Sequence, residues 1–95
     1  GRPKTNIPAA GAYAKAAFIV GVDQMYQAGW ATDYDRVVAA KVAHVVAGGD
    51  VAEGTLLSEQ HYLDLEREAF MSLLGEPRTM DRITHMLNTG KPLRN

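Results

Sequence analysis

The sequence predicts an all-α fold of four helices, and two patterns carry that prediction. Apolar residues recur every three or four positions through most of the chain, which is the spacing of an amphipathic helix. Capping residues, glycines and prolines separate these stretches at intervals typical of short helices. We expect helices near residues 9–29, 33–47, 59–74 and 77–89, an extended lead-in over 1–8, and a mobile tail over 91–95.

The first expected helix is rich in alanine, which has the highest helix propensity of all residues. Its inward stripe is predicted to contain Ala14, Phe18, Val22 and Met25. Gly21 interrupts this helix, and an internal glycine costs about 1 kcal/mol relative to alanine. We interpret Gly21 as either a weak point or a place where another helix approaches closely.

The second expected helix has clear start and stop signals. Thr32 supplies a hydroxyl cap, and two aspartates follow in the first turn, where the helix dipole favours negative charge. Gly48 and Gly49 end the helix, because glycine readily adopts the left-handed cap conformation. The valine-rich stretch between them also fits a buried strand, but its length and caps favour a helix. The inward stripe is predicted to comprise Tyr34, Val38, Val42 and Val45.

A loop over 51–57 leads to the third expected helix, which Ser58 caps and Gly75 closes. Its inward stripe is predicted to include Tyr62, Leu65, Ala69, Phe70 and Leu73. Glu66 falls on the same stripe. Because a lone buried charge costs several kcal/mol, we predict that Glu66 is a buried structural carboxylate with a partner. A general acid or base, or simple exposure at a rim, remain the alternatives.

The fourth expected helix begins at Pro77, a residue that suits the first turn, and ends at Gly90. Its apolar side carries Met80, Ile83 and Leu87, with Met86 beside them. The last part of the chain is locally basic. Dipole complementation explains cations near a helix C-terminus, and contact with a phosphate-bearing ligand is the alternative.

Composition narrows the function classes. A net charge of −1, with 10 basic and 11 acidic residues, predicts no nucleic-acid partner. No apolar run approaches the roughly 20 residues that span a membrane, and there is no cysteine, so we expect a cytoplasmic chain. Residues 1–95 are predicted to form a single domain. The first and third helices look apolar over wide arcs, which indicates that part of their surface packs against a larger structure.

No arrangement of residues predicts an active site. The histidines at 44, 61 and 85 lack the spacing of metal ligands, so we expect no metal. Asp64, Glu66 and Glu68 are close in sequence, but successive helical residues diverge by about 100°, so they do not form an acid/base cluster. We predict no catalytic residue and no cofactor site in the chain itself.

Several short motifs together resemble the C-terminus of a known enzyme family. They are Asp33-Tyr34-Asp35, Gly48-Gly49-Asp50, Ser58-Glu59-Gln60, Asp64 to Phe70, Leu73 to Pro77, and Gly90 to Asn95. In combination these motifs resemble the C-terminus of bacterial fusion proteins in which a crotonase-like part follows a 3-hydroxyacyl-CoA dehydrogenase. The closing helices of the wider crotonase (enoyl-CoA hydratase/isomerase) family are resembled by Leu65 to Phe70, Leu74, the Gly75-Glu76-Pro77 turn, Asp81, Ile83, Met86-Leu87 and Lys91-Pro92.

This resemblance implies a part of a fatty-acid β-oxidation enzyme whose parent uses NAD and a coenzyme A thioester. The partners it implies are the upstream crotonase-like core, further copies in a homo-oligomer, and acyl-CoA. It also implies that Phe70, Met86 and Lys91 line acyl-CoA or a subunit contact, although the sequence departs from the family pattern at Thr89-Gly90, next to Lys91. The alternative is a stand-alone helical protein-interaction module without enzymatic activity.

Overall fold

The computed structural model describes residues 7–95, and the fold is all-α, as predicted. Within that range the four helices are α1 (Gly11–Gln27), α2 (Asp33–Val46), α3 (Glu59–Leu74) and α4 (Pro77–Thr89). The predicted boundaries agree closely for the last three helices. Residues 1–6 of the expected lead-in lie outside the described range.

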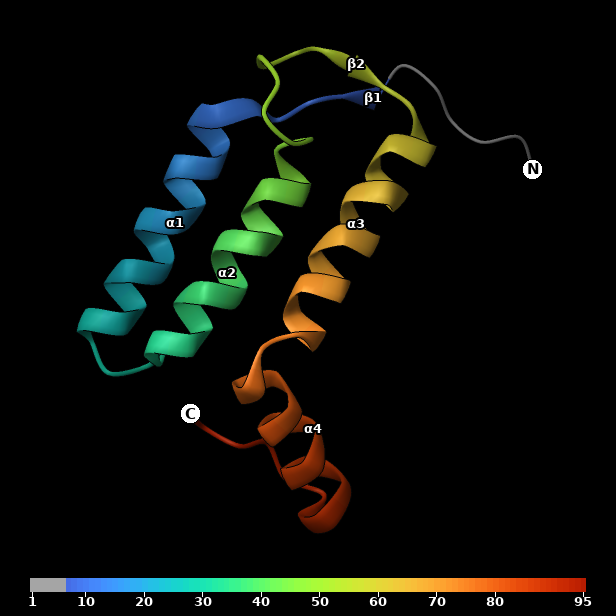
Figure 1. Cartoon of the computed structure of the whole chain (residues 1–95). Coiled ribbons are helices and arrows are strands. Elements are labelled where there is room, and N and C mark those ends of the chain that lie inside the picture. Colours follow the sequence, from blue (N-terminus) through green and yellow to red (C-terminus); the bar gives the residue numbers. More distant parts are fainter. Residues whose placement is uncertain (1–6) are drawn as a thin grey trace.

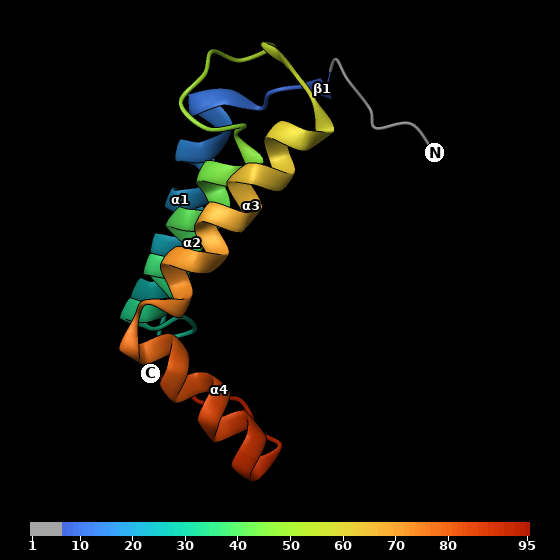
Figure 2. The same cartoon turned by 45° about the vertical axis from the view of Figure 1, so that its right-hand side comes forward.

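Helices α1, α2 and α3 lie side by side in one layer, with α2 between the other two (Figure 1). Consecutive helices of the layer run in opposite directions. Helix α4 leaves the end of α3 and projects away from the layer, which is clearest after rotation (Figure 2). The chain therefore exposes the two faces of a thin helical layer and most of the surface of a projecting helix.

A short antiparallel strand pair closes the top of the layer in Figure 1, in a region predicted to be a lead-in and a loop. β1 (Ile7–Pro8) pairs with β2 (Leu56–Leu57), so that Ile7 faces Leu57 and Pro8 faces Leu56. The Ala9 amide donates to the Thr55 carbonyl at 2.9 Å and extends this pairing. Because Ala9 is used in this way, α1 begins at Gly11 rather than at residue 9 as predicted.

The predicted helix caps are confirmed at the start of α2 and α3. Thr32 Oγ1 accepts a hydrogen bond from the Asp35 amide at 3.1 Å, and Asp35 Oδ2 accepts one from the Thr32 amide at 2.8 Å. This reciprocal arrangement satisfies two backbone donors at the helix start. Ser58 Oγ accepts from the His61 amide at 3.0 Å.

The end of α2 is fixed by a close approach as well as by backbone conformation. Gly48 has a φ of +86°, and its predicted capping role is confirmed. A Cβ atom at Gly48 would lie 2.7 Å from Leu57 Cδ1 and 3.1 Å from Ala9 Cβ. Glycine is therefore required both by the left-handed φ and by the space available beneath the strand pair.

The buried core is small and consists largely of alanine. Its members among the described residues are Ala9, Ala31, Tyr34, Ala43, Ala47 and Leu65. Alanine allows the helices of the layer to approach closely but buries little apolar area per residue. Tyr34 is the largest fully buried side chain, with 2% exposed, and its hydroxyl forms a hydrogen bond with Thr79 of α4.

Several predicted inward side chains are exposed. Phe18 and Met25 of α1 are 44% and 52% exposed, and a Cβ atom at Gly21 would meet nothing within 4 Å. The helix forms as its spacing predicts, but the predicted stripe is only partly the packed one. The half-buried residues of α1 are Ala14, Lys15, Ile19, Val22, Asp23 and Tyr26, of which only Ala14 and Val22 belong to the predicted stripe. Nothing within the described chain approaches Gly21.

Candidate functional site

The residues predicted for ligand or subunit contact are all on the surface. Phe70 of α3 is 61% exposed and Met86 of α4 is 44% exposed, while Lys91 is an exposed residue just after α4. An exposed position is required for contact with a ligand or partner, but it does not identify one. The contact roles of these three residues stay predictions.

Glu66 was predicted to be a buried carboxylate, and this prediction is wrong for the chain as it stands. Glu66 is exposed, whereas the preceding residue, Leu65, is only 9% exposed. Each step along a helix rotates the side chain by about 100°, so burial of Leu65 turns Glu66 away from the layer. The same rotation turns Phe70, five residues after Leu65, about 140° away from the packed face.

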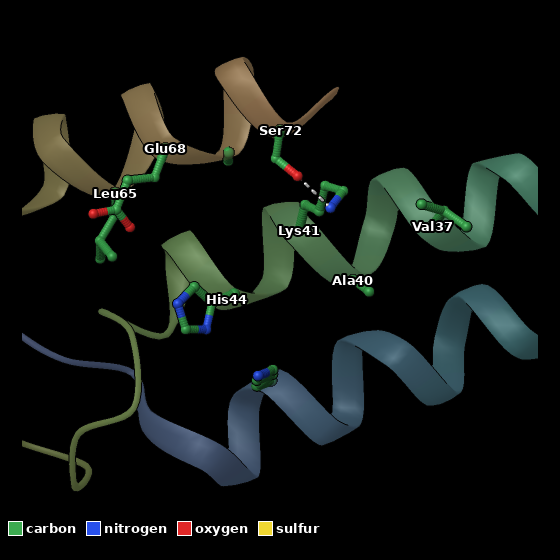
Figure 3. A pocket seen from close by; sticks show the side chains of 9 residues that line it. Val37, Ala40, Lys41, His44, Leu65, Glu68 and Ser72 are labelled. Carbon is green, nitrogen blue, oxygen red and sulfur yellow. Dashed lines mark hydrogen bonds between the residues drawn. The ribbon is translucent and has the colours of Figure 1, made fainter. Parts of the chain in front are cut away.

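One face of the layer is hollowed into a cleft of about 530 Å³ (Figure 3). Val37, Ala40, Leu65 and Ala69 supply its apolar lining. Its polar lining comes from three helices: Lys15 of α1, Lys41 and His44 of α2, and Glu68 and Ser72 of α3. Phe70, Met86 and Lys91 do not line this cleft, so the structure does not bring them together there.

Sequence reasoning considered His44 and Glu68 separately and did not predict that the polar groups of this cleft lie together. Lys41 Nζ donates a hydrogen bond to Ser72 Oγ at 2.7 Å, which Figure 3 marks with a dashed line. His44 Nδ1 lies 3.9 Å from Asp50 Oδ1 at the end of α2. Lys15 and Lys41 are 26 residues apart in sequence, and only the antiparallel pairing of α1 and α2 places them at one cleft. No local motif signals this arrangement.

A second polar cluster joins α4 and the C-terminal tail to the start of α2, and Arg82 is its centre. One guanidinium nitrogen of Arg82 donates to Asp35 Oδ1 at 2.9 Å, and Nε donates to Asn95 Oδ1 at 2.6 Å. The Arg82 guanidinium also lies over the Tyr34 ring, 4.9 Å from its centroid. The expected mobile tail is thus held by hydrogen bonds, and the Asn95 amide nitrogen also donates to the Arg78 carbonyl at 3.1 Å.

The charge of Asp35 is stabilised within this cluster. The hydrogen bond from the Thr32 backbone amide lowers the pKa of Asp35, and Arg82 lowers it further through a side-chain hydrogen bond and opposite charge, against the opposing effect of partial burial. The sequence indicated the place of Asp35 in the first turn of α2 but not its partner 47 residues away. Arg82 therefore joins the projecting α4 to the start of α2 through polar contacts, and no residue of α4 is buried.

The outer surfaces carry many large apolar side chains. Helix α3 exposes Leu63 and Phe70 at 48% and 61%, and α4 exposes Met80, Ile83 and Leu87 at 47%, 39% and 80%. Large apolar side chains that are exposed in groups commonly mark an interaction surface, whereas isolated ones need no explanation. We refer to Leu63, Phe70, Met80, Ile83, Met86 and Leu87 as the outer apolar residues.

Neither metal-ligand clusters nor membrane-spanning helices are found in residues 7–95. No three His, Cys, Asp or Glu residues in that range are grouped so that they could hold a metal ion. No helix there combines the length and apolar character needed to cross a membrane. Residues 7–95 therefore form a small all-helical domain with a lysine-containing cleft and exposed apolar side chains on its helices.

Comparison with known proteins identifies a relative that matches almost the whole chain. The chain is 44% identical over 94 residues, 99% of its length, to a Bacillus subtilis (strain 168) protein named "Probable 3-hydroxyacyl-CoA dehydrogenase". The chain spans only 12% of the length of that protein. No protein-family model matches the chain, and no solved structure matches it.

Proposed function

We propose that this chain serves as one helical part of a longer 3-hydroxyacyl-CoA dehydrogenase of fatty-acid β-oxidation. The observation that carries this proposal is the 44% identity over 94 residues to the Bacillus subtilis protein. The similarity extends over almost the whole chain, so it includes all four helices rather than one local motif. The longer protein would use NAD and a 3-hydroxyacyl-CoA substrate.

Within that protein, the proposed role of the chain is to supply packing surface and no catalytic residue. The outer apolar residues support this role, because each is exposed in the chain alone. A phenylalanine buries about 150–250 Å² when fully covered. Covering the exposed 61% of Phe70 would therefore contribute about 2–4 kcal/mol at roughly 25 cal/mol per Å².

The proposed hydratase part, homo-oligomer and contact residues follow from the resemblance to the crotonase family. The longer protein would also carry a crotonase-like enoyl-CoA hydratase part, against which these helices pack, and it would form a homo-oligomer. Phe70 and Met86 would line acyl-CoA or a neighbouring subunit, and Lys91 would lie near a phosphate of coenzyme A. The exposure of all three residues is compatible with these roles.

A stand-alone helical interaction module is the second candidate, and the same outer apolar residues favour it. The two candidates differ in what covers those residues: another part of one long polypeptide, or a separate protein. The length of the Bacillus relative favours the first candidate, because most of that polypeptide lies outside the matched segment.

The test is a segment exchange in the Bacillus subtilis protein. The matched segment would be deleted, and in a second version it would be replaced by residues 1–95 of this chain. NAD reduction with a 3-hydroxyacyl-CoA substrate would be measured for both versions and for the intact protein. We expect the deletion to lose soluble active enzyme and the replacement to restore it. A soluble replacement protein without activity, or a fully active deletion, would contradict the proposal.

A further inference from the structure

The cleft between α1, α2 and α3 is lined by two lysine side chains that form no ion pair with a described carboxylate. In residues 7–95, neither Lys15 Nζ nor Lys41 Nζ lies within 4.0 Å of a carboxylate oxygen. The bond from Lys41 goes to a neutral hydroxyl, that of Ser72. Both lysines are half-buried at the cleft, so their charges are not simply extended into bulk solvent.

The neighbouring cleft contains one cation, Arg36, that is paired with carboxylates. Arg36 lines a second cleft on α2, and its Nε donates to Asp23 Oδ1 at 2.9 Å. Asp33 Oδ1 lies 3.8 Å from the same guanidinium. The two clefts share Val37 and Ala40, so they lie on the same side of α2. A carboxylate therefore compensates Arg36 on this side of α2, whereas none lies within ion-pair distance of Lys15 or Lys41 among the described residues.

The polar lining of the first cleft suits an anion with several oxygen acceptors. Two ammonium groups, the Ser72 hydroxyl and the His44 ring line the cleft from three helices, and each can donate hydrogen bonds. Lysine is a common phosphate-binding residue, and its bonds to phosphate are charge-assisted. Glu68, on α3, also lines the cleft, and its negative charge opposes anion binding.

The apolar lining indicates that the anion is attached to an apolar group. Val37, Ala40, Leu65 and Ala69 present only hydrocarbon, and a volume of about 530 Å³ exceeds what a lone phosphate fills. Small-molecule sites typically combine such a lining with a few polar groups that fix orientation. We propose that this cleft binds a phosphate monoester carried on an apolar body, with Lys15 and Lys41 holding the phosphate.

This site is independent of the proposed function, because it rests only on the cleft of this chain. The probe is phenyl phosphate, titrated into the 95-residue chain and followed by NMR shifts of backbone amides, with inorganic phosphate and phenol as separate arms. We expect phenyl phosphate to bind most tightly and to shift Val37, Ala40 and Ala69. Inorganic phosphate should bind more weakly, and phenol should produce no saturable shift.

The variants separate a specific site from general attraction to positive charge. Lys15→Gln combined with Lys41→Gln should weaken phenyl phosphate binding at least about tenfold, because it removes both charge-assisted hydrogen bonds to the phosphate. Arg67→Gln removes one exposed cation outside the cleft and should leave binding unchanged. Glu68→Gln should strengthen binding, because it removes a like charge.

Circular dichroism of each variant checks that the helices remain formed. Equal affinity of the double variant and the unmodified chain would overturn the proposal, as would an absence of phenyl phosphate binding. An equal loss on Arg67→Gln would also overturn it, because the attraction would then depend on net charge alone. If the double glutamine variant loses its helices, the variant Lys15→Arg with Lys41→Arg is tested in its place. Retained phenyl phosphate binding by this variant supports the proposal, and lost binding with intact helices contradicts the proposal.

Discussion

Gly48 offers a direct test of how the strand pair fixes the end of α2. Gly48→Ala places a methyl group at a φ of +86° and 2.7 Å from Leu57 Cδ1. The left-handed conformation costs a non-glycine residue about 1–2 kcal/mol, and overpacking typically costs a further 1–3 kcal/mol. We expect a total loss of about 2–5 kcal/mol in the free energy of unfolding.

Gly54→Ala is the matched control for this prediction. Gly54 has a nearly equal φ of +80°, but a Cβ atom there would meet nothing within 4 Å. This variant should show only the conformational cost, about 1–2 kcal/mol. Urea unfolding followed by circular dichroism measures both variants. If Gly48→Ala destabilises no more than Gly54→Ala, the close approach to Leu57 is not a constraint and the reasoning fails.

Three further predictions concern the Arg82 cluster, the core and catalysis. Because the pKa of Asp35 is lowered in the folded chain, its charge stabilises the fold above pH about 4, and this contribution is lost as the pH falls through the lowered pKa. Asp35→Asn should therefore flatten the acidic part of a curve of unfolding free energy against pH. An unchanged curve would contradict this prediction. Leu65→Ala should lower the free energy of unfolding by about 2–4 kcal/mol, whereas Phe70→Ala should change it by less than about 0.5 kcal/mol in the chain alone; equal effects in chemical denaturation would refute the assigned burial. The chain alone should not hydrate crotonyl-CoA, and measurable loss of the enoyl absorbance would show that catalytic residues were overlooked.

Local signals predicted the helices well. The Thr32 and Ser58 caps, the Gly48-Gly49 stop and Pro77 each act within a few residues, so the sequence alone locates them. The strand pair was missed because its strands have two residues each and pair across 48 residues or more, too short for a period to be recognised.

The choice of packed face could not be predicted as reliably. Helices α1 and α3 carry apolar side chains on more than one face, so periodicity alone does not say which face packs within this chain. Because of that ambiguity, Glu66 and Phe70 were wrongly predicted to be buried. The lysine-containing cleft and the Arg82 cluster depend on long-range pairing, for which single short motifs give no signal.

The central claim is that the outer apolar residues are covered in a longer dehydrogenase. Hydroxyl-radical footprinting measures this directly at Phe70 and Met86, in the chain alone and in the segment-exchanged Bacillus subtilis protein. The account predicts rapid oxidation of both side chains in the chain alone, where they are 61% and 44% exposed, and several-fold slower oxidation in the longer protein. Equal oxidation rates at both residues in the two proteins would contradict it.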